Sequence, residues 1–93
     1  MISEQLQQTA IQIINHFGVD PQIEKMYEEI QELLEIKSHE EEIDEMADCF
    51  FILLQHYLIN PEMQERVDYK AKRTVDRIRE NYYNKISEVN KNE

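Results

Sequence analysis

The sequence predicts an all-α protein: a bundle of four helices, the last of them long, assembled as a homo-oligomer. No segment alternates apolar and polar residues with the period of two that a half-buried strand requires. Apolar residues instead recur every three or four positions in four segments, and the one glycine and two prolines fall where these segments begin or end. The short connections favour antiparallel neighbours within a single domain, residues 1–93.

The first two helices are expected on either side of Gly18. Apolar residues at helical spacing predict a helix from Leu6 to Phe17, and Gly18 should cap it because glycine adopts the left-handed conformation without a Cβ penalty. Asp20 and Pro21 then predict the N-cap and the first residue of the second helix. The apolar stripe of this second helix comprises Ile23, Met26, Tyr27, Ile30, Leu33 and Leu34.

The third and fourth helices begin at two further capping signals. Ser38 to Glu41 matches a capping box, which opens the third helix. Asn60 followed by Pro61 opens the fourth, for which fraying is expected after Asn90. An apolar line follows the fourth helix along its length. This line comprises Val67, Ala71, Val75, Ile78, Tyr82, Ile86 and Val89.

The third helix is apolar on nearly all of its sides. Its broad apolar side comprises Ile43, Met46, Ala47, Phe50, Phe51, Leu53, Leu54, Tyr57 and Leu58. On the other side, Ile52 and Ile59 stand in line with Glu45 and Asp48. Such a helix requires burial on nearly all sides, which is more than one small protomer supplies. We therefore expect a homodimer or homotetramer, with the carboxylates in a cleft near the subunit interface.

Charge and cysteine content narrow the function classes. Twenty acidic residues against ten basic ones give a formal net charge of −10, so nucleic acid and anionic membranes are poor partners. The one cysteine, Cys49, and an amino terminus without a signal-peptide pattern favour a reducing compartment, and we expect a cytoplasmic protein. Cys49 itself should pack as a small apolar side chain.

Two acidic clusters on consecutive helices are the strongest functional signal. Glu29 and Glu32 are three residues apart, with Glu28 beside them, and Glu45 and Asp48 repeat this spacing on the next helix. Residues three apart lie on one helix face. Two helices that present such pairs to each other form a nest of at least four carboxylates. A hard divalent cation such as Mg²⁺ would neutralise this nest.

The second helix also places polar residues along the border of its apolar stripe. Side chains at such a border can turn toward a cleft while the backbone stays packed. The polar residues on this line are Gln22, Lys25, Glu29 and Glu32.

The fourth helix carries the opposite charge. Four basic residues step by four, three and four positions and form a line that could bind an anion, since arginine binds phosphate through paired hydrogen bonds. They are Arg66, Lys70, Arg73 and Arg77. The alternative is that these cations pair with acidic neighbours along the helix. Those neighbours are Glu62, Glu65, Asp76 and Glu80.

These motifs resemble those of the MazG-like nucleoside triphosphate pyrophosphohydrolases, members of the all-α NTP pyrophosphatase superfamily. The pattern EExxE at Glu28–Glu32, followed by ExxD at Glu45–Asp48, carries the resemblance. Flanking residues extend it from Ile14 to Ile78. They are His16, Phe17, Gly18, Gln22, Lys25, Leu33, Ala47, Gln55, Lys70, Arg73 and Arg77. The chain contains no tryptophan, so base stacking would fall to Phe17, Tyr57 or another tyrosine.

The resemblance implies a MazG-like four-helix bundle. It also implies hydrolysis of a nucleoside triphosphate between the α and β phosphates, with Mg²⁺ or Mn²⁺ as the cofactor, in the control of nucleotide pools. The metal ligands that it implies are Glu29, Glu32, Glu45 and Asp48. Glu28 or Glu29 would take the proton of the attacking water. The phosphate-binding residues that it implies are Lys25, Lys70, Arg73 and Arg77.

Two other functions remain open from the sequence. The phosphoribosyl-ATP pyrophosphohydrolases of histidine synthesis share the acidic motifs of the superfamily and cleave the corresponding bond. A non-catalytic, oligomeric helical adaptor would carry its acidic residues only as solvated surface. The adaptor predicts neither stabilisation by Mg²⁺ nor turnover of any nucleotide.

Overall fold

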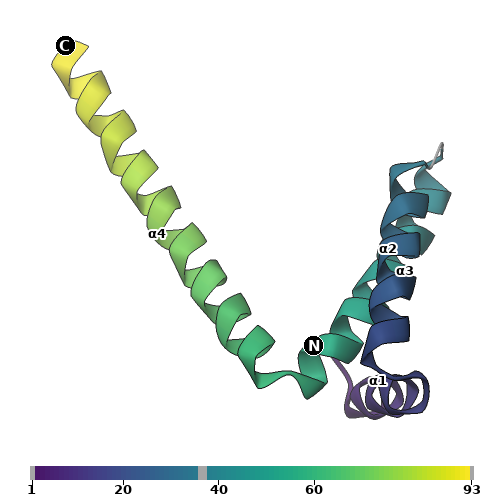
Figure 1. Ribbon diagram of the computed structural model, residues 1–93. Helices are drawn as coiled ribbons and strands as arrows, with labels where there is room; N and C mark the ends of the chain where they lie inside the picture. Colours follow the sequence, from purple (N-terminus) through teal and green to yellow (C-terminus); the bar gives the residue numbers. More distant parts are fainter. Residues whose placement is uncertain (1, 36–37, 93) are drawn as a thin grey trace. The chain divides into compact units, whose positions relative to one another are not determined.

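The computed structural model describes residues 2–35 and 38–92, with side chains up to Asn81. This part of the chain is all-helical, as predicted, and contains no strand. Its four helices are α1 (Glu4–Phe17), α2 (Val19–Leu34), α3 (His39–Ile59) and α4 (Pro61–Asn92), as Figure 1 shows. The chain divides into two units, a first unit of Met1–Pro61 that holds α1 to α3 and a second unit of Glu62–Glu93.

In the first unit, α2 and α3 run side by side and antiparallel, and α1 packs against both (Figure 1). The buried apolar side chains come from α1 and α3. They are Ala10, Ile14, Cys49, Ile52 and Leu54. Burial raises the pKa of the Cys49 thiol above its ordinary value, which agrees with the prediction that Cys49 packs as a small apolar side chain.

The face of α2 that packs within the first unit differs from the predicted one. Its buried residues are Gln22 and Glu29, whereas Tyr27 and Leu34 of the predicted apolar stripe are 64% and 75% exposed. The polar line at the border of the stripe therefore places Gln22 and Glu29 against the other helices, while Lys25 and Glu32 stay exposed. Its polar groups must find partners there, because a buried polar group without one is costly.

Gly18 turns the chain between α1 and α2 within a single residue. Its φ of 94° and ψ of 162° lie in a region that is essentially open only to glycine. Its N–H donates to the carbonyl of Ile14 at 2.8 Å and ends α1 as predicted. The prediction that Asp20 caps α2 is wrong, because α2 begins at Val19 and Gly18 is also its N-cap. Asp20 instead lies in the first turn, where its negative charge interacts favourably with the helix dipole.

Gly18→Ala is expected to destabilise the protein by about 1–3 kcal/mol, since alanine must be held in a sparsely populated conformation. An added Cβ would lie 3.7 Å from Cδ of Pro21, an ordinary contact, so the cost comes from the backbone. Urea unfolding of the variant measures this loss. Thr9→Ala, at an exposed helical position, serves as the control, and equal stability of the two variants would contradict the prediction.

The other helix starts are set by side-chain caps and proline. Ser38 Oγ accepts the N–H of Glu41 at 3.2 Å, which confirms the serine part of the predicted capping box. Ser3 Oγ accepts the N–H of Leu6 at 3.1 Å and caps α1 in the same way. Helix α4 begins at Pro61, as predicted.

Helix α4 is continuous from Pro61 to Asn92. Of its predicted apolar line, Val67, Val75 and Ile78 are exposed, while the side chains of Tyr82, Ile86 and Val89 lie outside the described ones. Within the described residues, no helix combines the length and the apolar character needed to span a membrane.

Candidate metal centre and adjoining cleft

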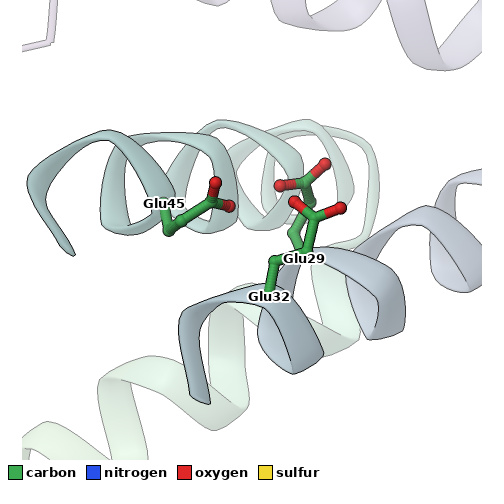
Figure 2. Close-up of side chains that lie close together, drawn as sticks. All are labelled: Glu29, Glu32 and Glu45. Carbon is green, nitrogen blue, oxygen red and sulfur yellow. The ribbon is translucent and has the colours of Figure 1, made fainter. Parts of the chain in front are cut away.

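Three glutamates from two helices converge between α2 and α3. Figure 2 shows that Glu29 and Glu32 of α2 and Glu45 of α3 point their carboxylates toward one another. One oxygen atom of each lies within 4.8 Å of those of the other two. Glu29 is 5% exposed, Glu45 is half-buried and Glu32 is exposed. We call these three residues the glutamate cluster.

The glutamate cluster contains buried oxygen atoms without hydrogen-bond partners. Glu29 Oε2 and Glu45 Oε2 are both inaccessible to solvent, and neither has a partner among the described residues. A buried acceptor left unpaired costs about 1–3 kcal/mol, and more when it is charged. A divalent cation with a preference for oxygen ligands would remove this cost. The donor set, three carboxylates, suits Mg²⁺ or Mn²⁺.

Lys25 balances part of the charge. Its Nζ lies 3.1 Å from Glu29 Oε1 and 3.6 Å from Glu28 Oε2. Burial opposes the ionisation of Glu29, but its hydrogen bond with Lys25 and the charge of Lys25 hold the pKa of Glu29 below its ordinary value. The hydrogen bond to Glu29 in turn raises the pKa of Lys25. This pair is therefore ionised at neutral pH.

Glu45 shifts in the opposite direction. Loss of solvent and the neighbouring carboxylates of Glu29 and Glu32 raise the pKa of Glu45 from 4.5 to about 7. This shift brings the titration of the Glu45 carboxyl toward neutral pH. A proton and a metal ion would therefore compete for the carboxylate of Glu45.

A cleft of about 410 Å³ adjoins the glutamate cluster. Polar and apolar side chains line it together. They are Ile13, Phe17, Gln22, Lys25, Glu29, Asp48, Phe51, Ile52 and Gln55. Gln22 Nε2 donates to Gln55 Oε1 at 2.7 Å and joins α2 to α3. Glu29 therefore belongs both to the cluster and to the cleft wall.

The remaining predicted acidic residues lie beside the glutamate cluster. Asp48 is exposed and lines the cleft with Glu29, but it is not one of the three residues whose oxygens converge. Glu28 is exposed and pairs with Lys25. The structure thus brings Glu29, Glu32 and Glu45 together and places Asp48 and Glu28 next to them.

The predicted basic residues of α4 belong to the second unit. Among side chains up to Asn81, no ion pair joins Arg66, Lys70, Arg73 or Arg77 to an acidic neighbour, so pairing along the helix is not observed. The guanidinium groups of Arg66 and Arg73 instead lie 4.7 Å and 5.9 Å from the ring centroid of Tyr69. Binding of phosphate by Lys70, Arg73 and Arg77 stays a prediction.

The buried amide pair was not predicted as a site feature. Gln22 and Gln55 are 8% and 1% exposed, although glutamine is usually a surface residue. A signal was present for Gln22, which shares the border line of α2 with Lys25 and Glu29. Gln55 lies seven residues after Asp48, which is about two helical turns, so both residues lie on the same face of α3.

Comparisons of the chain with known protein families, with curated proteins and with solved structures give no match. The function of the site therefore has to follow from its own chemistry.

Proposed function

We propose that the protein is a Mg²⁺-dependent nucleoside triphosphate pyrophosphohydrolase, which cleaves ribo- or deoxynucleoside triphosphates between the α and β phosphates. The products are a nucleoside monophosphate and pyrophosphate. The observation that carries this proposal is the convergence of Glu29, Glu32 and Glu45, with two buried oxygen atoms that lack partners. The resemblance of the motifs to MazG-like enzymes supports the same reaction, and with it a MazG-like bundle and a role in cytoplasmic nucleotide pools.

The glutamate cluster would hold the metal ion, with Asp48 as a further ligand from the cleft wall. Mg²⁺ or Mn²⁺ bound there would neutralise part of the triphosphate charge and lower the pKa of a bound water. Carboxylate oxygens are the ligands that such hard cations prefer. The cluster offers them from two helices, on which the spacing of the acidic residues fixes which side chains can meet.

Further residues would act on the attacking water and on the phosphates. Of the two candidate bases, Glu29 is needed in the glutamate cluster, so Glu28 takes the proton of the attacking water. Glu28 is exposed and directly precedes Glu29 of the cluster in sequence, and a general base must reach the proton it abstracts. Lys25 lines the cleft and would bind phosphate oxygens, while phosphate binding by Lys70, Arg73 and Arg77 is what the resemblance implies.

A panel of ribo- and deoxynucleoside triphosphates and phosphoribosyl-ATP, incubated with and without Mg²⁺, tests the proposal. We expect monophosphate and pyrophosphate, formed only with the metal and resolved by chromatography. Diphosphate and orthophosphate would contradict it. Turnover of phosphoribosyl-ATP alone would assign the site to the reaction of histidine synthesis. Absence of both turnover and stabilisation by Mg²⁺ would favour the adaptor.

The proposal includes a homodimer or homotetramer. Large apolar side chains of α2 and α3 are exposed in the structure, and exposed apolar patches favour association. They include Tyr27, Leu34, Ile43, Met46 and Phe50. Sedimentation velocity is expected to give a mass above that of one chain, and a monomer at micromolar concentration would contradict this part of the proposal.

A further inference from the structure

We propose that the cleft beside the glutamate cluster binds the base of a nucleotide, and that Gln22 and Gln55 determine which base is preferred. The inference rests on the proposed function for the identity of the substrate. The proposed function concerns the phosphates, on which the acidic and basic residues act. The inference adds the base, which distinguishes one nucleotide from another.

The position of the cleft favours a ligand with two chemically different ends. Glu29 and Lys25 belong to its lining, so a molecule in the cleft reaches the charged residues of the metal centre. The volume of about 410 Å³ falls in the range of small-molecule pockets, about 300–1,000 Å³. A polyphosphate alone would leave the apolar lining unused. A nucleotide uses both kinds of surface.

The apolar lining has the chemistry of a stacking surface. Phe17 and Phe51 come from α1 and α3 and both line the cleft. Phe17 is 58% exposed, yet its ring is packed against that of His16, edge to face, with a centroid distance of 4.7 Å. Aromatic side chains bind bases by stacking on their flat faces. An exposed but supported ring at the end of α1 suits this role.

The amide pair adds hydrogen-bonding groups to the same cleft. Exchange of both partners of a buried hydrogen bond for apolar groups is often nearly neutral, so packing alone does not require two glutamines here. Each amide can form several hydrogen bonds, and the bond between Gln22 and Gln55 uses one donor and one acceptor. The remaining capacity of the pair matches the edge of a base, where donors and acceptors lie side by side. A site built to hydrogen-bond its substrate discriminates strongly against one that lacks the matching group.

The double variant Gln22→Leu/Gln55→Leu tests the role of the amides. It removes both partners together, so neither is left unpaired in the interior. We expect the parent protein to differ in kcat/KM among the bases by about tenfold or more, and the variant to compress this range to within about threefold. Affinity for Mg²⁺ alone should be unchanged. A folded double variant that keeps the parental ranking, or a parent protein that does not rank bases, would overturn the inference.

Phe51→Leu provides a second test that does not depend on the amides. We expect its KM for the preferred nucleotide to rise about tenfold or more through loss of stacking, while binding of pyrophosphate with Mg²⁺ stays at the parental level. Phe50→Leu is the matched control, because Phe50 is 51% exposed and does not line the cleft. The mass of both variants in solution is measured as well, because Phe50 is among the side chains expected at the subunit interface. Equal KM values for the two variants would count against base binding in this cleft.

Titration of the parent protein with nucleosides, which carry no phosphate, separates this inference from the proposed function. We expect NMR signals of Phe51 and Gln55 to shift in the absence of metal. Nucleoside binding without hydrolysis of any triphosphate would leave the inference intact and contradict the proposed function. Hydrolysis without any shift of these signals would contradict the inference alone.

Discussion

Glu45→Gln is expected to abolish Mg²⁺-dependent hydrolysis while leaving the protein folded. Glutamine has nearly the same shape but cannot supply the anionic oxygen that the metal requires. The loss should exceed about a hundredfold, since even residues that only support metal ligands contribute about ten- to a hundredfold. Without metal and above neutral pH, the variant should be at least as stable as the parent, because Glu45 no longer places a charge beside Glu29 and Glu32.

Thermal unfolding in EDTA and in Mg²⁺, measured together with the hydrolysis rate, checks both parts of this prediction. Mg²⁺ should raise the Tm of the parent and have little effect on the variant. Glu42→Gln is the matched control, because Glu42 is exposed in the first turn of the same helix and lies outside the glutamate cluster. Hydrolysis by Glu45→Gln at the parental rate would show that the metal site has been assigned to the wrong residues.

Binding of Mg²⁺ is expected to strengthen steeply as the pH rises toward neutrality. Loss of solvent, together with Glu29 and Glu32, raises the pKa of Glu45 from 4.5 to about 7 in the folded protein. The metal must displace the proton on Glu45, so below this pKa affinity should fall about tenfold per pH unit. Above it affinity should level off. Lys25, whose pKa is raised, stays charged throughout this range.

Without metal, the stability of the protein should instead decrease as the pH rises toward neutrality. The folded state keeps a proton on Glu45 that the unfolded state releases at its ordinary pKa of 4.5. The contribution of Glu45 to stability is therefore greatest below the unfolded pKa and is lost as the pH rises through the folded pKa of about 7.

Calorimetric titration with Mg²⁺ and thermal unfolding in EDTA, from about pH 5.5 to about pH 8.5, measure these two trends. The Glu45→Gln variant should lose both. Equal affinity of the parent for Mg²⁺ at the two ends of this range would contradict a metal site that includes Glu45.

The helices and their ends could be predicted because the signals that set them are local. Ser38 and Pro61 act within one helical turn, and their neighbours in sequence are enough to identify them. The spacing of Glu29 and Glu32 likewise fixes that both point from one face of α2. Gly18 shows the limit of such signals: its role as a cap of α1 was predictable, but its role as a cap of α2 in place of Asp20 depends on the turn that its φ and ψ complete.

The sequence by itself determined an all-α chain, the location of its helices and the faces on which its carboxylates lie. Only the tertiary structure decided that Glu45, rather than Asp48, completes the group of three converging glutamates. It also decided that Gln22 and Gln55 meet in the interior, while Tyr27 of the apolar stripe is exposed. The physical reason is that a helical pattern defines faces but not the rotation of one helix against its neighbours. That rotation is set by the packing of α1 and α3 on α2, through contacts between residues far apart in the sequence.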